Sequence, residues 1–425
     1  MVDSSVFDRA ASMSRGKRRA AVIALMAVPG TVGAQAKPVQ PRAVTYPVTA
    51  TAPARWTVGT RPLLEIGGAD GIGPTELTKI TGVTRQVDGT IVVANGETGE
   101  LRFFDARGRF VRATAGHGGG PGELEYLTRM FAVDDTLLVV DGRIKAHVYA
   151  PNGKWMRSLV LPAIPGYLRN PGVGALGPFD VVLPLRGGGS DERRFDPRRN
   201  DKIRMDSIWF GGVSVRDSSA RVLLGQPWAP SFALAPGRPA AYAVGFAPRT
   251  LIAATRDRIC TGYPERYEVL CTDTIGRHTL RIVRDTPRRA VTDSARRAYR
   301  DNQAGRRSDG TSRFAGDLRK HRERVAAATQ FAHYFPAYSE LLFARTGELW
   351  VRAFAPADGM LSRPTPYYTQ AGRSTWSIYG RDGKWLADCT LPARFGLAEV
   401  GADYVIGISF DEDDVERVTL LSLRR

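Results

Sequence analysis

A short pattern of apolar and polar positions occurs three times along the chain. The segments 103–111, 148–156 and 378–386 each contain an apolar strand end, a polar turn that closes with glycine, a basic residue and a second apolar strand. This order is typical of a β-hairpin. Because one hairpin cannot bury its own apolar face, the repetition predicts several small sheets that pack against one another.

A longer repeat contains these hairpins. A Gly-Pro-x-Glu-Leu sequence occurs at 73–77 and again, 47 residues later, at 120–124. The apolar strands at 92–94 and 139–141 keep the same offset, and this length accommodates four short strands with their turns. We count six units, centred near residues 95, 140, 215, 260, 355 and 410. The pattern does not place the strand boundaries within 163–250.

The pattern changes between the fourth and fifth units. Thr292 offers an N-cap, residues 295–304 are rich in alanine and arginine without strand alternation, and Gly305 follows. A second helix is expected over 314–333. We predict that residues 287–335 are an Arg-rich helical insertion, because they contain too few apolar residues to form a separate core.

The Gly-Pro-x-Glu-Leu loops, the strand ends Val-Ala-Asn and Val-Val-Asp, and the Phe-Asp-x-x-Gly hairpin together resemble the NHL-type repeat of six-bladed β-propellers. The segments 347–351, 376–391 and 411–417 are also similar to exported bacterial proteins of this kind. The resemblance implies an all-β fold, a six-bladed β-propeller over 56–425 with the helical insertion between the fourth and fifth blades.

Closure of such a ring removes exposed sheet edges, and the resemblance implies that both ends of the propeller contribute to it. We expect a strand near 56–66 to complete the blade built by 402–423. Residues 37–55, which are rich in proline, are interpreted as a linker or extended segment.

The first 36 residues have the order of a secretory signal peptide. A basic segment at 15–19 precedes a short apolar segment at 20–28, and Ala-Gln-Ala at 34–36 fits cleavage before Lys37. The apolar segment is shorter than the roughly 20 residues that span a bilayer, so we expect no membrane span and a periplasmic or secreted protein. The alternative is a cytosolic protein with a basic N-terminal tail.

The basic charge is concentrated in one region. The formal net charge of the chain is +17, and residues 277–330 contain 15 Arg or Lys against six Asp or Glu. The export signal and the lack of a nucleic-acid motif in this region argue against a nucleic-acid partner. An anionic polysaccharide, lipopolysaccharide or an acidic protein would suit an exported protein, and a solvated helical face is the alternative without function.

Two cysteines flank a predicted hairpin. If the turn centres on Glu265 and Arg266, Cys260 and Cys271 lie opposite each other in an antiparallel ladder, within the span of a disulfide. The alternative is two buried free thiols. Cys389 has no obvious partner and fits a strand.

Five residues are candidates for binding. His117 lies in the second glycine-rich loop, where it could contact a phosphate or a metal or simply belong to a tight turn. Arg352, Tyr367, Tyr368 and Arg373 belong to the irregular loop of the fifth unit and could line one mouth of the channel. Core packing and plain loop surface explain them equally well.

The sequence contains no catalytic or metal-binding motif that we recognise. We therefore expect a monomeric, non-enzymatic exported propeller that needs no cofactor and binds a carbohydrate, peptide or protein at one face. The alternative is a lactonase-like hydrolase or lyase with a divalent cation in its channel, for which Asn95 and Asp141 are the candidate oxygen ligands. Whether the protein is an enzyme stays open at this point.

The export prediction can be checked directly. Expression of the whole chain in a Gram-negative host should give a periplasmic protein that begins at Lys37, because the segment 1–36 is removed on export. Mass spectrometry of the periplasmic fraction measures the new N-terminus, and a chain lacking 1–36 serves as the control that stays in the cytoplasm. A full-length protein with an intact N-terminus in the cytoplasm would contradict the prediction.

Overall fold

The computed structural model describes residues 41–133, 135–142, 145–160, 174–176, 180–186, 203–214, 220–232, 234, 242–307, 309–357 and 372–425. Most of this part is β-strand, with two α-helices. The predicted signal peptide at 1–36 lies outside it. None of the helices in the described part is long and apolar enough to cross a membrane.

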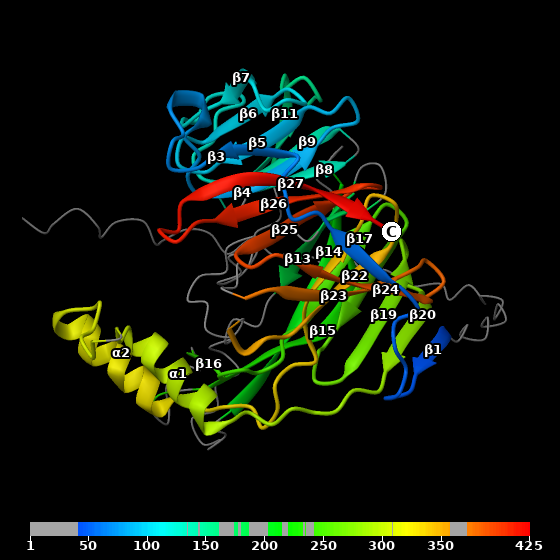
Figure 1. Ribbon diagram of the computed structural model, residues 1–425, viewed down its shortest axis with the longest axis vertical. Helices are drawn as coiled ribbons and strands as arrows, with labels where there is room; N and C mark the ends of the chain where they lie inside the picture. Colours follow the sequence, from blue (N-terminus) through cyan, green and yellow to red (C-terminus); the bar gives the residue numbers. More distant parts are fainter. Residues whose placement is uncertain are drawn as a thin grey trace, which may run out of the picture. The chain divides into compact units, whose positions relative to one another are not determined.

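Two of the sheets have four antiparallel strands each, and in both of them consecutive strands pair (Figure 1). The first sheet contains β4 (Ile80–Arg85), β5 (Ile91–Asn95), β6 (Glu100–Phe104) and β7 (Phe110–Ala115). The second contains β8 (Leu127–Val133), β9 (Thr136–Asp141), β10 (Lys145–Tyr149) and β11 (Trp155–Val160). Since β4 and β8 begin 47 residues apart, the predicted repeating unit is one such sheet.

The third and fourth sheets have five strands each. The third contains β12 (Gly174–Leu176), β13 (Asp180–Arg186), β14 (Ile203–Ser214), β15 (Ala220–Phe232) and β16 (Tyr242–Ala243). The fourth contains β17 (Leu251–Thr255), β18 (Arg258–Gly262), β19 (Tyr267–Asp273), β20 (His278–Arg284) and, from the N-terminal region, β1 (Arg42–Tyr46). The strands β14 and β15 are 12 and 13 residues long, which explains why the repeat is hard to follow here in the sequence.

The last sheet has nine strands and consists of two antiparallel runs. One run contains β21 (Tyr338–Phe343), β22 (Leu349–Ala353), β23 (Ser374–Tyr379) and β24 (Trp385–Leu391). The other contains β25 (Phe395–Val400), β26 (Tyr404–Phe410) and β27 (Glu416–Arg424). The short strands β2 (Arg55–Val58) and β3 (Leu64–Gly67) complete the sheet.

The four separate sheets and the two runs β21–β24 and β25–β27 are here called strand groups. Apolar clusters join each strand group to the next in chain order. Side chains of the first and second sheets pack together, as do those of the third and fourth, of the fourth sheet and β21–β24, and of β21–β24 and β25–β27. The strands β8 and β12 connect the second sheet to the third. Finally, β25–β27 packs against the first sheet. A cyclic order of small antiparallel sheets that pack face to face is the arrangement of a β-propeller.

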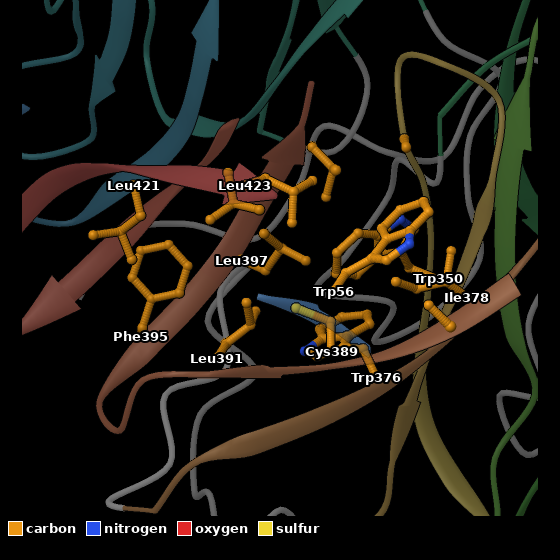
Figure 2. Packing of buried hydrophobic residues seen from close by; sticks show 14 residues of the cluster. Trp56, Trp350, Trp376, Ile378, Cys389, Leu391, Phe395, Leu397, Leu421 and Leu423 are labelled. Atoms are coloured by element: carbon orange, nitrogen blue, oxygen red, sulfur yellow. The ribbon is translucent and has the colours of Figure 1, made fainter. Parts of the chain in front are cut away.

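Tryptophan side chains dominate the cluster between β21–β24 and β25–β27 (Figure 2). The rings of Trp56 and Trp376 each lie 6.1 Å from the ring of Trp350, in edge-to-face geometry. Leu397 and Leu423 extend the cluster towards the last strands. Trp56 belongs to β2, so the N-terminal region supplies part of this core.

Residues 42–67, here called the N-terminal strap, run along the outer edges of three successive strand groups. β1 pairs in parallel with β20, and β2 pairs in parallel with β24 and antiparallel with β27. β3 then pairs antiparallel with β27, which confirms the expected closure by both ends of the domain. The strand β1 lies within the predicted linker at 37–55; it contains no proline, so each of its residues keeps a backbone N–H.

The two helices lie in sequence between β20 and β21. α1 (Asp293–Ala304) begins after Thr292, whose hydroxyl accepts a hydrogen bond from the amide of Ala295, and it ends at Gly305 with φ of 69°. This N-cap and this end are the ones that the sequence predicts. α2 (Gly316–Ala328) ends five residues earlier than expected.

The early end of α2 has a structural cause. The chain that follows the helix forms a β-bridge in which Phe331 pairs with Gly245. Phe331 thereby joins an aromatic cluster with Phe246, Tyr299 and Phe335, in which the ring of Phe246 lies 5.0 Å from that of Phe335 and 5.1 Å from that of Tyr299. The cluster therefore joins α1 to the segments that flank it and to Phe354, which directly follows β22.

The strap can be tested through its tryptophan. Trp56→Ala should lower the free energy of unfolding by about 3–5 kcal/mol, because it empties a large buried site between two strand groups. Val48→Ala is the matched control in the same strap, since Val48 is 59% exposed, and should change stability by less than about 0.5 kcal/mol. Urea unfolding followed by circular dichroism measures both. Equal effects of the two substitutions would show that the strap does not contribute to the core.

Candidate functional site

The strand groups have two ends that differ in their connections. At one end of each strand group, a turn joins its first strand to its second, and, where a fourth strand follows, another turn joins its third strand to its fourth. We call this end the turn face, and we call the opposite end the loop face. On the turn face the connections are short, as at 86–90, 105–109 and 150–154. On the loop face they include the long segments 285–337, which contains both helices, and 354–373.

Arg345 lies at the centre of a polar network on the turn face. Its Nε is 3.1 Å from a carboxylate oxygen of Glu399, and one of its terminal nitrogens donates to the hydroxyl of Thr84 at 3.0 Å. The other terminal nitrogen lies 4.0 Å from Asp135. These four residues come from β21–β24, β25–β27, the first sheet and the second sheet, so the network joins four strand groups.

Glu399 accepts hydrogen bonds from several donors at once. The hydroxyls of Thr84 and Tyr404 donate at 2.6 and 2.7 Å, and the backbone N–H of Arg85 at 3.4 Å. Burial and the neighbouring Glu399 carboxylate raise the pKa of Tyr404, which keeps its hydroxyl protonated as a donor. A carboxylate with this many donors stabilises the structure and has little capacity left for a ligand.

Further contacts connect neighbouring turns on the same face. The guanidinium of Arg258 donates to the backbone carbonyls of Gly347 and, at 3.1 Å, of Arg381. Arg425 donates to Glu348 at 2.5 Å. Burial would raise the pKa of Glu348, but the hydroxyl of Thr346 and the charge of Arg425 outweigh it, so that this pKa is lowered. The turn face is thus fastened by polar contacts between strand groups.

His117, a predicted binding residue, is exposed on the loop face. Its Nε2 lies 2.7 Å from the backbone carbonyl of Glu97. A Cβ atom added to Gly99 would lie 3.2 Å from its Nδ1, so the ring occupies the space that this glycine leaves free. The imidazole therefore braces two loops of the first sheet, and a role in binding stays a prediction.

Arg352 and Arg373, also predicted binding residues, lie on and next to two paired strands, β22 and β23. Arg352 on β22 is buried, pairs in register with Trp376 on β23, and has a guanidinium nitrogen 3.2 Å from a carboxylate oxygen of Glu340. Arg373 is exposed and directly precedes β23. Tyr367 and Tyr368 lie outside the described residues. His117 contacts the carbonyl of Glu97 in the first sheet, whereas Arg352 contacts Glu340 on β21.

A buried polar group in the second sheet was not predicted. His147 on β10 lies between two neighbouring strands, with its Nδ1 2.9 Å from the Ser158 hydroxyl on β11 and its Nε2 3.4 Å from an Asp141 carboxylate oxygen on β9. In a catalytic triad the carboxylate binds Nδ1 and the serine binds Nε2, so the contacts here are reversed.

Asp141 also accepts hydrogen bonds from two backbone amides, of Glu125 at 3.1 Å and of Tyr126 at 2.5 Å. Its burial opposes ionisation, but His147 and the two amides outweigh this effect and lower the pKa of Asp141. Asn95 at the end of β5 accepts in the same way from the amide of Thr78, at 2.7 Å. Both residues thus anchor the loop before the first strand of their sheet, a role different from the cation ligands considered above.

Cys260 and Cys271 are joined by a disulfide between β18 and β19, in the register that the hairpin predicts. Cys389 is buried as a free thiol beside Trp376 (Figure 2), and its burial raises the pKa to about 12. It packs as a small apolar residue rather than as a nucleophile. In the described part of the chain, no three His, Cys, Asp or Glu side chains lie close enough together to hold a metal ion.

The anchoring role of Asp141 predicts a pH dependence. The lowered pKa means that the Asp141 charge stabilises the fold above its ordinary pKa of 3.8 and that this contribution is lost as the pH falls through the folded-state value. Asp141→Ala should lower the free energy of unfolding by about 2–3 kcal/mol at pH 7 and by less at pH 3.5. Asp141→Asn introduces the amide side chain that Asn95 has at the corresponding position of the first sheet. It should lower the free energy of unfolding less than Asp141→Ala does. Urea unfolding at both pH values measures this, and an effect independent of pH would contradict it.

Comparison with known proteins gives a structural likeness only. No family model matches the chain, and no curated protein does. A member of the DUF4221 family from Bacteroides vulgatus is similar, with a TM-score of 0.50 and 11% identity over 87% of this chain and 99% of that one. A catalytically inactive virginiamycin B lyase from Staphylococcus aureus gives a TM-score of 0.38 at 9% identity, over 87% and 99% of the two chains. BamB from Moraxella catarrhalis gives 0.31 at 12% identity, over 80% and 82%. The first likeness supports the fold, and none of the three transfers an activity to this chain.

Proposed function

We propose that this chain is an exported, non-enzymatic six-bladed β-propeller that binds a carbohydrate, peptide or protein at its loop face. The six blades are the four separate sheets, the run β21–β24, and the run β25–β27 completed by β3. In this assignment α1 and α2 are an insertion between the fourth and fifth blades. Each blade packs on its two neighbours, as ring closure requires.

The observation that carries the proposal is the difference between the two faces. On the turn face, charged side chains such as Arg345, Glu399 and Arg258 are engaged in contacts between strand groups. On the loop face the connections include the long segments 285–337 and 354–373, and Arg373 is exposed there. Long loops on a rigid scaffold are where propellers and other repeat folds place their binding residues.

Two features support an extracytoplasmic location. The segment 1–36 has the composition of a signal peptide. The disulfide between Cys260 and Cys271 is a bond that persists in oxidising compartments. Both are expected of a periplasmic or secreted protein.

Paired substitutions on the two faces test the proposal. The purified protein is applied to arrays of glycans and peptides, and each ligand found is then titrated against Arg373→Glu and Lys154→Glu. Arg373→Glu reverses an exposed charge on the loop face and should weaken binding by about tenfold or more, as expected when one charge-assisted contact is lost. Lys154→Glu reverses an exposed charge in a turn on the opposite face and should leave binding unchanged.

Three results would contradict the proposal. These are arrays without any bound ligand, weakening by Lys154→Glu but not by Arg373→Glu, and chemical conversion of the ligand by the wild-type protein. Circular dichroism of both variants establishes that the fold is intact.

A further inference from the structure

The helices α1 and α2 with the turn between them, residues 293–328, form a hairpin with an excess of positive charge. This hairpin contains nine Arg and one Lys against five Asp or Glu. Three of the acidic residues are engaged within it: Asp293 with Arg296 at 3.2 Å, Asp301 with Arg306 at 3.4 Å, and Asp317 with Lys320 at 3.6 Å. Since the cations outnumber the acids two to one, positive charge stays available after these pairs have formed.

Several of the remaining cations point into solvent. Arg297 on α1 and Arg319 and Arg324 on α2 are exposed. Arg324 has a terminal nitrogen 3.5 Å from a ring nitrogen of His321. In the described part of the chain, these three arginines take part in no ion pair. The guanidinium groups of Arg297 and Arg319, and the N–H groups of Arg324 that do not face His321, can donate to an anionic ligand.

Other arginines of the hairpin are held against aromatic rings. The guanidinium carbons of Arg313 and Arg322 lie 5.0 and 5.2 Å from the centre of the Phe314 ring. That of Arg300 lies 5.0 Å from the centre of the Phe331 ring. Stacking of this kind orients the planar cation while leaving N–H groups at its edge. It also covers the aromatic faces on which nucleic-acid bases would stack.

The apolar side chains of the hairpin face the protein. Tyr299 and Val325 are buried, and Tyr299 belongs to the aromatic cluster with Phe246 and Phe335. Within the described part of the hairpin, Leu318 is the large aliphatic side chain that is exposed. A protein interface usually has an apolar centre, and a helix that lies on a membrane has an apolar face. A hydrophilic polyanion fits this surface better than either.

We propose that the α1–α2 hairpin binds an anionic polysaccharide, whose carboxylate, sulfate or phosphate groups accept paired hydrogen bonds from the arginine side chains. The predominance of Arg over Lys favours this geometry, since the guanidinium offers two parallel donors to one planar or tetrahedral anion. The inference names the ligand class for the loop face and rests on the extracytoplasmic location proposed above.

Heparin serves as the polyanionic probe for the full-length mature protein. Isothermal titration should give a dissociation constant that rises steeply with salt, as for any interaction that releases counterions. The triple variant Arg297→Gln, Arg319→Gln, Arg324→Gln should bind at least about tenfold more weakly, with a shallower salt dependence. The corresponding triple Lys variant keeps the charge but loses the paired donors, and should fall between the two.

The matched control removes the same charge elsewhere. Arg61→Gln, Arg107→Gln and Lys154→Gln neutralise three exposed residues outside the hairpin and should leave heparin affinity within about twofold. If the hairpin Gln variant and this control variant weaken heparin binding equally, heparin binding depends only on net charge, and the proposal is overturned. So would tighter binding to a DNA duplex of equal charge or to vesicles containing anionic lipid. Unchanged melting temperatures exclude unfolding as the cause.

The outcome can be separated from that of the proposed function. Heparin binding is measured on purified protein, so it succeeds or fails regardless of where the cell places the chain. If the hairpin variants bind heparin as well as the wild type while Arg373→Glu weakens binding of a ligand from the arrays, the proposed function stands and this inference is wrong.

Discussion

The pairing of β3 with β27 is the contact on which the rest of the structure depends. Without it, residues 417–420 of β27 would lack a partner on their outer edge, and only the short strand β2 would pair with the end of β27. Val418 on β27 and Ile66 on β3 belong to the same apolar cluster as Val83 and Val93 of the first sheet. The hydrogen bonds of the last strand and the apolar contact between the last and first sheets therefore form together, and closure is cooperative rather than the sum of local sheets.

Closure also explains why the two faces differ in character. Sheets arranged in a closed order bring their short turns close to one another, and charged residues there can reach two or three neighbours. Arg345 does so, with Glu399, Thr84 and Asp135 around it. The connections on the other face have no such restriction on their length. They accommodate two helices between β20 and β21 without disturbing the strand order. Substitutions should therefore lower stability less on the loop face than among the interlocked charges of the turn face.

Local patterns allowed much of the fold to be predicted. The strand length of the repeat, the capping residues of α1 and the facing positions of Cys260 and Cys271 all depend on neighbours in sequence, and a single sequence contains them. β1 lies in the segment that its proline content marks as a linker or extended segment, and its partner β20 lies more than 230 residues away, beyond the reach of a local pattern. The polar network of the turn face could not be predicted from local patterns either, since Thr84, Arg345 and Glu399 meet only after the sheets have packed. His117 was singled out for its glycine-rich surroundings, which the structure explains by a contact within one sheet.

The position of the strap at the start of the chain has a consequence for how the protein matures. Synthesis proceeds from the N-terminus, so the strap is made first, yet its partners β20, β24 and β27 are made much later, and β27 is nearly the last segment to emerge. Throughout that interval its strands have backbone groups without their final partners, a state open to mispairing with other chains. Contacts between such distant segments also form slowly. The strap therefore stays open to mispairing until the last strand of the chain has been made.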